Sequence, residues 1–329
     1  MSEQNITSFD LKDVRKILQN CPKESSPAVK GGQICAPKNE AMLKQEQEEA
    51  MEQPIIGYRV LDKMGSGGTA VVFKAQNIAN NEIVALKLLY PGFVQDKKSL
   101  KQFVNEGMML MRLEHPNILK GIDFGVSKGM YFIALEFVHG ESLDLFLRQG
   151  FRFTEEYTFG VALQIAQALA YLESNSIVHR DIKPANILLM EESDVKLCDF
   201  AFAFESNKQD KDDGVFDVTC GTVEYISPEQ ARGYRDIDIR SDIYSLGITC
   251  IHMLTGHVPF SDKDPNEVMR CQIYEKINLN KIPISQHGRM ILQRMVAKKR
   301  EQRLLPSRLV PVLKKFLKNL SLKNTEVKK

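Results

Sequence analysis

The sequence has no patterned cysteines, no excess of one charge and no tryptophan. Its 44 basic and 42 acidic side chains nearly cancel, which argues against a globally basic nucleic-acid-binding protein. The cysteines form no C-x-x-C pair and have no regular spacing, which excludes a zinc ribbon and a disulfide framework. They are Cys21, Cys35, Cys198, Cys220, Cys250 and Cys271. We therefore expect reduced thiols, a cytoplasmic location and no nucleic-acid partner.

We also expect no signal peptide and no transmembrane segment. The first residues lack the basic segment and apolar run of a signal peptide. Residues 243–261 contain no Asp, Glu, Lys or Arg and mimic a membrane span. However, Gly256 and Pro259 end the helical part near Thr255, which leaves too few residues to cross a bilayer. We interpret this segment as a buried core helix.

The composition of the 329 residues, 43% hydrophobic and 26% charged, is that of an ordinary globular chain with one large or two smaller units. Residues 1–53 are polar and contain several prolines and glycines, so we expect a flexible N-terminal extension. Residues 294–329 carry 12 basic and 2 acidic side chains. A basic end of this kind suits an acidic partner or a lipid surface. A solvated helix face is the favoured interpretation, because an apolar stripe has helical spacing. The stripe is Leu309, Leu313, Phe316, Leu317 and Leu320.

The apolar pattern predicts a sheet-rich part followed by a helical part. Short Val- and Ile-rich segments predict antiparallel strands at 58–63, 70–76, 82–89, 121–125 and 130–137. A helix is predicted over 97–113. Beyond Gly140 the pattern is mostly helical, and the segment 154–174 begins with Thr154 as N-cap. The fold class is therefore α+β, with a cleft between the two halves.

A glycine-rich turn follows the first predicted strand, in Met64-Gly65-Ser66-Gly67-Gly68-Thr69-Ala70-Val71-Val72. Glycines let backbone N–H groups approach an anion closely, which suits a phosphate. A plain hairpin turn explains them equally well. A P-loop is excluded because no G-x-x-x-x-G-K-[ST] occurs, and a Rossmann motif is excluded because a strand follows the glycines.

Two further segments carry polar residues of catalytic type. Lys87 ends the apolar strand segment Val84-Ala85-Leu86-Lys87, and Glu106 lies on the following helix. Each is typical of a structural residue alone, but together they would hold an ammonium group for binding phosphate. The strongest signal is His179-Arg180-Asp181-Ile182-Lys183-Pro184-Ala185-Asn186, followed by Cys198-Asp199-Phe200. In this pattern Asp181 can accept a proton from a hydroxyl, and Lys183 can neutralise phosphate charge. The side-chain oxygens of Asn186 and Asp199 are ligands suited to Mg²⁺.

Together these motifs resemble the Hanks-type (eukaryotic-like) serine/threonine protein kinases, over roughly residues 58–317. The bacterial members are the most similar, on the segments Ser227–Gly233 and Arg240-Ser241-Asp242. The resemblance implies the two-lobed protein kinase fold with the active site in the cleft. It places a small antiparallel-sheet N-lobe with one helix at 54–138 and a larger helical C-lobe at 139–320. Residues 321–329 remain as a basic C-terminal tail.

The resemblance also implies ATP and Mg²⁺ as cofactors and assigns a role to each motif residue. Asp181, as the base, Lys183 and Lys87 are the catalytic residues, and Asn186 and Asp199 are the metal ligands. The residues that contact ATP are Met64, Gly65, Ser66, Gly67, Gly68, Val72, Ala85, Lys87, Glu106, Glu136, Val138 and Leu188. Leu135 falls at the gatekeeper position, so Glu136 to Val138 would give adenine its backbone hydrogen bonds.

Later landmarks fit the same family. Asp242 corresponds to a buried acid that anchors the catalytic loop, and Arg303 is placed to pair with Glu229. Lysine at 183 and threonine at 222 imply serine/threonine rather than tyrosine specificity. The implied activity is transfer of the ATP γ-phosphoryl group to proteins in bacterial signalling.

Regulation and partners follow from the family as well. Because Arg180 precedes Asp181, the family implies control by a phosphate in the activation segment, on Thr219 or on Ser206. Protein substrates and a homodimer for autophosphorylation are the implied partners.

One departure keeps alternative functions open. Ala201 replaces the glycine after Asp199-Phe200, and alanine has fewer backbone conformations than glycine. This favours a pseudokinase that binds nucleotide and transfers phosphate poorly as the second interpretation. A regulatory scaffold that uses the two termini is the third, but it leaves the retained polar residues unexplained.

Overall fold

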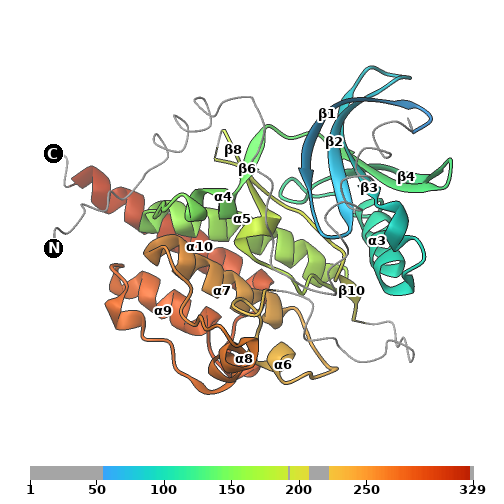
Figure 1. Cartoon of the computed structure of the whole chain (residues 1–329). Helices are drawn as coiled ribbons and strands as arrows, with labels where there is room; N and C mark the ends of the chain where they lie inside the picture. Colours follow the sequence, from blue (N-terminus) through green and yellow to red (C-terminus); the bar gives the residue numbers. More distant parts are fainter. Residues whose placement is uncertain (1–54, 192, 207–221, 327–329) are drawn as a thin grey trace, which may run out of the picture. The chain divides into compact units, whose positions relative to one another are not determined.

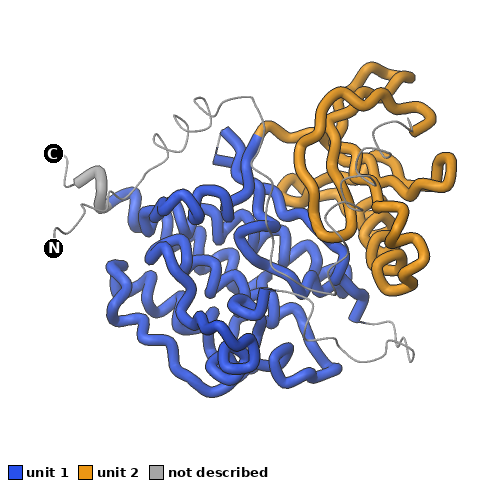
Figure 2. Tube along the Cα trace, viewed as in Figure 1, with its two compact units in different colours: residues 1–20, 140–329 blue, residues 21–139 orange. Residues whose placement is uncertain are grey.

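The computed structural model describes residues 55–191, 193–206 and 222–326 (Figure 1). These residues form two compact units, one of residues 55–139 and one of residues 140–326 (Figure 2). The predicted N-terminal extension and Thr219 lie outside the described residues. The mixed α+β class is confirmed, with an antiparallel sheet in the smaller unit and mostly helices in the larger one.

The smaller unit is a five-stranded antiparallel sheet in the order β1-β2-β3-β5-β4, with one α-helix beside it (Figure 1). Its elements are β1 (Tyr58–Ser66), β2 (Ala70–Asn77), β3 (Ile83–Leu89), α3 (Lys97–Leu110), β4 (Gly121–Ser127) and β5 (Met130–Glu136), with a short 3-10 turn, η1 (Pro91–Phe93). Lys128 and Gly129 join β4 to β5 with φ of 50° and 82°, the left-handed pair that a two-residue hairpin needs. Phe73, Leu86 and Ala134 from the central strands are fully buried in the core.

Two element boundaries in this unit differ from the sequence prediction. The helix predicted over 97–113 ends at Leu110, because Arg112 N–H bonds to the carbonyl of Met109 and tightens the last turn. The first strand continues to Ser66 instead of ending at residue 63. Its pairing with β2 shifts register between Lys63 and Gly65, so Met64 stands in a bulge.

The larger unit is built on helices. They are α4 (Leu143–Arg148), α5 (Glu155–Ser174), α6 (Pro228–Ala231), α7 (Arg240–Thr255), α8 (Pro265–Tyr274), α9 (Gln286–Met295) and α10 (Pro306–Glu326). Short strands accompany them in two small sheets: β6 (Gly140–Ser142), β8 (Ile187–Met190) and β9 (Val195–Leu197), and β7 (Ile177–Val178) with β10 (Phe204–Glu205). The unit also contains the 3-10 turns η2 (Pro184–Asn186), η3 (Leu279–Lys281) and η4 (Arg300–Gln302).

Helix α5 is central to this unit. As predicted, Thr154 caps it through Tyr157 N–H, and two glutamates follow in the first turn. It packs against α7 and α10, and the rings of Phe159 and Phe316 meet edge to face with centroids 4.8 Å apart. On α10, the stripe residues Leu309 and Leu313 are fully buried, whereas Lys314, Lys315 and Lys318 are exposed. This burial supports the solvated-face interpretation of the basic stretch.

Helix α7 is the segment that mimics a membrane span. All but three of its 16 residues are buried, and it ends at Thr255, where Gly256 takes a left-handed φ of 79°. The interpretation as a core helix is therefore confirmed. No helix in the described ranges is long and apolar enough to cross a membrane.

Candidate active site

The predicted pair of Lys87 and Glu106 is formed within the smaller unit. Lys87 lies on the central strand β3, between Val72 of β2 and Ile133 of β5. Its Nζ is 2.7 Å from Oε1 and 2.6 Å from Oε2 of Glu106 on α3. The Glu106 side chain is 3% exposed and that of Lys87 is 19% exposed. The pair fixes the ammonium in place, and its binding of a phosphate oxygen stays a prediction.

Gly107 brings α3 close enough to the sheet for this pair to form. A Cβ atom at Gly107 would lie 2.3 Å from the ring of Phe124 on β4, so only glycine permits the observed approach of α3 and β4. The role of Gly107 was not predicted from the sequence. The available signal was a glycine inside a helix, directly after a predicted functional acid, where glycine costs about 1 kcal/mol relative to alanine.

The glycine-rich segment forms the end of β1 and the turn into β2. Gly67 N–H bonds to the carbonyl of Ala70 at 2.8 Å and closes the turn. A Cβ atom at Gly65 or Gly68 would meet nothing within 4 Å, and neither residue has a positive φ. Neither backbone strain nor packing therefore requires these two glycines. Close approach of an external group to the backbone would require them.

Residues predicted to contact adenine are distributed over both units. Val72 and Ala85 lie on adjacent strands of the smaller unit, and Leu188 lies on β8 of the larger one. The Glu136 amide already donates to the carbonyl of Lys120 at 2.9 Å, whereas the Val138 amide has no hydrogen bond among the described residues. The amide of Val138 can therefore donate to a ligand.

Asp242 on α7 anchors the His179–Asn186 loop through two backbone amides. Its Oδ2 accepts the amide of His179 and its Oδ1 accepts the amide of Arg180, each at 2.8 Å. Complete burial raises the pKa of Asp242 to about 7, although the two amide hydrogen bonds favour the carboxylate and lower the pKa. Arg180 takes a left-handed φ of 67° at this point. The two amide bonds hold the loop in this unfavourable backbone conformation.

Asp181, Lys183 and Asn186 meet in one polar cluster. Lys183 Nζ is 2.8 Å from Asp181 Oδ2, and Asn186 Nδ2 donates to the carbonyl and to Oδ2 of Asp181 at 2.8 and 2.9 Å. Burial lowers the pKa of Lys183, but the charges of Asp181 and Asp199 outweigh it and raise the pKa overall. Lys183 is therefore a cation at neutral pH, and Asp181 is oriented from two sides.

Asn186 and Asp199 have the oxygen donors that a magnesium ion prefers. Since Nδ2 of Asn186 is used on Asp181, its Oδ1 remains for another partner. Mg²⁺ takes few protein ligands and completes its shell with phosphate and water oxygens, so a pair of this kind fits it. Within the described part of the chain, no group of three or more His, Cys, Asp or Glu residues could hold a metal alone.

The segment after Asp199 is well packed. Asp199 has a φ of 63°, and Phe200 is fully buried with its ring edge-on to His179 at 4.7 Å. The Ala201 amide lies 3.4 Å from Asp199 Oδ1, and Ala201 itself has no positive φ. The alanine therefore adopts this conformation without backbone strain.

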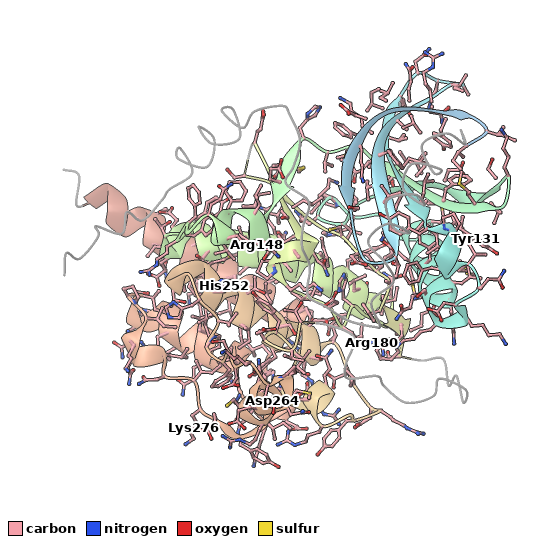
Figure 3. All side chains as sticks on the ribbon, viewed as in Figure 1. Tyr131, Arg148, Arg180, His252, Asp264 and Lys276 are labelled. Carbon is pink, nitrogen blue, oxygen red and sulfur yellow. The ribbon has the colours of Figure 1, made fainter. Side chains whose placement is uncertain are left out.

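Arg180 (labelled in Figure 3) contacts the same segment. Its Nε donates to the carbonyl of Phe202 at 2.6 Å, and its guanidinium lies 4.4 Å from the ring centroid of Phe204. Ser206, one of the two predicted phosphorylation sites, donates its hydroxyl to the carbonyl of Ser176 at 3.0 Å. The role of either site stays a prediction.

Helix α6 supports the loop and is itself joined to a distant segment. Ser227 and Gln230 form a capping box at α6, and Gln230 Nε2 donates to the carbonyl of Arg180 at 2.9 Å. The predicted ion pair of Glu229 and Arg303 is present and buried. Gln230 was missed as a support of the loop, although the spacing Ser227-x-x-Gln230 is the sequence signature of a capping box.

Comparison with known proteins finds sequences similar to this chain. The family model described as protein kinase domain matches residues 58–314. A probable serine/threonine-protein kinase of Clostridium acetobutylicum is 36% identical over 75% of this chain and 37% of its own length. Serine/threonine-protein kinase pkn3 of Myxococcus xanthus is 35% identical over 62% of the chain and 38% of its own length. PrkC of Bacillus subtilis, also a serine/threonine-protein kinase, is 36% identical over 62% of the chain and 31% of its own length. The chain thus spans about a third of the length of these relatives.

Proposed function

This chain belongs to the protein kinase family, and from that premise we propose that it is a serine/threonine protein kinase of bacterial signalling. It transfers the γ-phosphoryl group of ATP to a serine or threonine hydroxyl of a protein. The observation that carries the proposal is the cluster of Asp181, Lys183 and Asn186 on a loop held by the buried Asp242. The relatives named above are bacterial serine/threonine kinases, which supports the substrate class.

Each side chain has a separate task in this mechanism. Asp181 orients the acceptor hydroxyl and takes its proton, because Lys183 and Asn186 fix its carboxylate. Lys183 compensates negative charge on the transferred group. Lys87, held by Glu106, binds phosphate oxygens of ATP.

The remaining groups position the nucleotide. The open backbone at Gly65 and Gly68 receives phosphate, and the free amide of Val138 donates to adenine. The amide of Glu136 is already bonded to the carbonyl of Lys120, so it does not donate to adenine. The carbonyl of Glu136 is therefore the backbone group that accepts the second adenine hydrogen bond. Mg²⁺, which the family generally uses with ATP, would be held by Asn186 Oδ1 and Asp199 and would neutralise phosphate charge. Catalysis is then mainly positioning and electrostatic stabilisation.

The retained polar groups favour this activity over a pseudokinase. Ala201, the departure that suggests lost activity, takes no positive φ and lies beside an intact Asp199. A cytoplasmic location and a homodimer that autophosphorylates stay predictions from the sequence.

A transfer assay tests the proposal. The full chain is incubated with γ-labelled ATP, Mg²⁺ and a general protein acceptor, and the products are hydrolysed for phosphoamino-acid analysis. We expect phosphoserine or phosphothreonine from the wild type and from Asp194→Asn, a matched control at an exposed acid of the same unit. Asp181→Asn should produce neither. Label on tyrosine, or no label from any variant, would contradict the proposal.

A further inference from the structure

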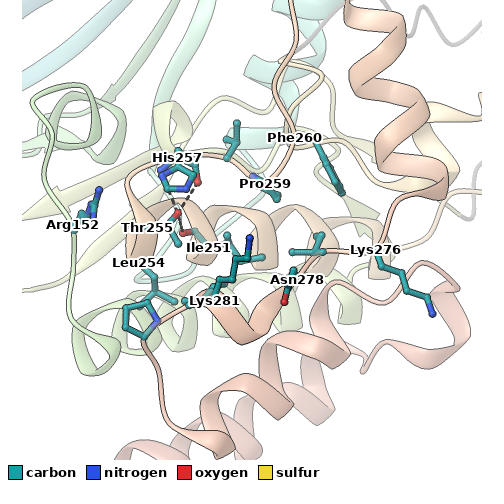
Figure 4. Close-up of a pocket in the computed structure, with 14 residues that line it drawn as sticks. Arg152, Ile251, Leu254, Thr255, His257, Pro259, Phe260, Lys276, Asn278 and Lys281 are labelled. Atoms are coloured by element: carbon teal, nitrogen blue, oxygen red, sulfur yellow. Dashed lines mark hydrogen bonds between the residues drawn. The ribbon is translucent and has the colours of Figure 1, made fainter.

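A pocket of about 430 Å³ lies within the larger unit at the C-terminal end of α7 (Figure 4). Its walls come from the end of α7 and the turn after it, from the segment 276–283, and from Arg152. No residue of the proposed active site lines it. Its volume falls in the range of roughly 300–1,000 Å³ that is typical of small-molecule sites.

Most of the pocket wall is apolar. The apolar residues that line it are Ile251, Leu254, Val258, Pro259, Phe260, Ile277, Ile282 and Pro283. Ile251 and Leu254 are 3% and 6% exposed, so they form a fixed floor on α7. The Phe260 ring is held by Lys298, whose Nζ lies 4.9 Å from the ring centroid. These walls suit the apolar body of a ligand.

The charged residues of the pocket all have the same sign. Arg152, Lys276 and Lys281 line it, and no aspartate or glutamate does. In the described ranges, none of these three side chains makes a hydrogen bond or an ion pair. Figure 4 shows Arg152 and Lys276 at opposite ends of the pocket, with Lys281 between them in this view. Among the described residues, the positive charge of the pocket lining therefore has no acidic partner in direct contact.

Arg152 differs from the two lysines because it is half-buried. Its Nε would lie 3.1 Å from a Cβ atom at Gly256, so the guanidinium occupies the space that the missing side chain leaves. Gly256 also has a left-handed φ of 79°, a backbone conformation that favours glycine over residues with a side chain. A planar guanidinium in a half-buried position is the preferred partner of a carboxylate.

We propose that this pocket binds a small amphiphilic carboxylate, with its apolar body on the α7 floor and its carboxylate at Arg152. Lys276 and Lys281 add to the attraction at longer range. A neutral apolar molecule would leave the three cations uncompensated. A polyanion without an apolar body would leave the apolar walls in water. The proposal is independent of phosphoryl transfer, since it concerns other residues of the chain.

Isothermal titration of the full chain with dodecanoate, below its micelle concentration, tests the proposal. We expect saturable binding of one molecule per chain. Dodecanol and dodecyltrimethylammonium keep the apolar body and lose or reverse the charge, and hexaglutamate keeps the charge without the body. All three should bind at least about tenfold more weakly, the factor that one charge-assisted hydrogen bond supplies.

Variants locate the site. Arg152→Gln should raise the Kd for dodecanoate about tenfold, whereas Lys263→Gln, an exposed lysine outside the pocket, should leave it unchanged. Val258→Trp should fill the pocket and remove binding, with its fold checked by circular dichroism. If Val258→Trp does not fold, the comparison of the Arg152 and Lys263 variants decides alone.

Several results would overturn the proposal. Binding that does not saturate, or equal affinity for dodecanoate and dodecanol, would remove the role of the positive charge. Equal affinity for hexaglutamate would assign the pocket to an acidic peptide. Unchanged binding in a folded Val258→Trp, or in Arg152→Gln, would place the dodecanoate elsewhere.

Discussion

The buried pair of Arg303 and Glu229 joins the end of η4 to α6, and its removal has a calculable cost. The two guanidinium nitrogens Nη1 and Nη2 bind Oε1 and Oε2 at 2.6 and 2.8 Å. The other N–H groups bind the carbonyls of Arg240, Ala297 and Lys298. The Arg303 side chain is 0% exposed and that of Glu229 5% exposed. Every donor of this arginine is therefore satisfied away from water.

Removing either partner leaves a buried, uncompensated charge. Arg303→Met leaves the Glu229 carboxylate without its counter-ion, and Glu229→Met leaves the buried guanidinium without its carboxylate. Each should therefore lower the free energy of unfolding by about 3–5 kcal/mol. In the Arg303→Met background, Glu229→Met removes the stranded carboxylate and should cost at most about 1 kcal/mol. We thus expect a coupling energy of about 3 kcal/mol between the two positions.

Urea unfolding followed by far-UV circular dichroism measures this cycle, since the chain has no tryptophan. Arg300→Met is the matched control, because Arg300 pairs with Asp236, whose side chain is 70% exposed. Such an exposed pair contributes at most about 1 kcal/mol. If Glu229→Met cost the same in both backgrounds, or if Arg300→Met cost as much as Arg303→Met, burial would not be the source of the stability.

Three further predictions follow from the described contacts. Gly107→Ala should destabilise the smaller unit by about 1–3 kcal/mol, because its Cβ would meet Phe124. Gly160→Ala is the control and should not destabilise the protein, because a Cβ there meets nothing within 4 Å. Urea unfolding measures both variants. Ala201→Gly should leave turnover within a few-fold, because Ala201 has no positive φ; activation by tenfold or more would instead support the pseudokinase. Burial lowers the pKa of His252 (labelled in Figure 3) to about 4, below its unfolded value near 6.5, so its share of the stability is present above pH 6.5 and lost as the pH falls through 4. His252→Gln should remove about 2 kcal/mol of this acid sensitivity in unfolding measured from pH 7 to pH 4, and an unchanged pH profile would contradict the assignment.

The sequence predicted the elements whose periodicity is strong. The alternating strands of the smaller unit and the capped helix α5 lie where the pattern placed them, within a few residues. The stripe on α10 is buried at Leu309 and Leu313 as its helical spacing indicated. The pairs Lys87–Glu106 and Glu229–Arg303 are also present as predicted. These contacts join distant segments, and they could be predicted only because the family resemblance implied them.

Features that depend on tertiary packing could not be predicted from the periodicity of the sequence. The bulge at Met64 arises from the register between β1 and β2, which no local pattern encodes. The early end of α3 depends on one i→i−3 hydrogen bond. Gly107 matters only because α3 packs on Phe124, and Gln230 only because α6 lies beneath Arg180. The assigned site residues stay predictions until they are tested by substitution.

The most direct test of the central claim compares nucleotide binding with phosphoryl transfer in Asp181→Asn. The substitution keeps the size of the side chain and removes the carboxylate that Lys183 and Asn186 orient. We predict that the rate of transfer from γ-labelled ATP to a protein acceptor falls by a factor of about 10²–10⁴, while the Kd for ATP changes by no more than a few-fold. An Asp181→Asn protein that retained wild-type turnover would contradict the assignment of Asp181 as the catalytic base.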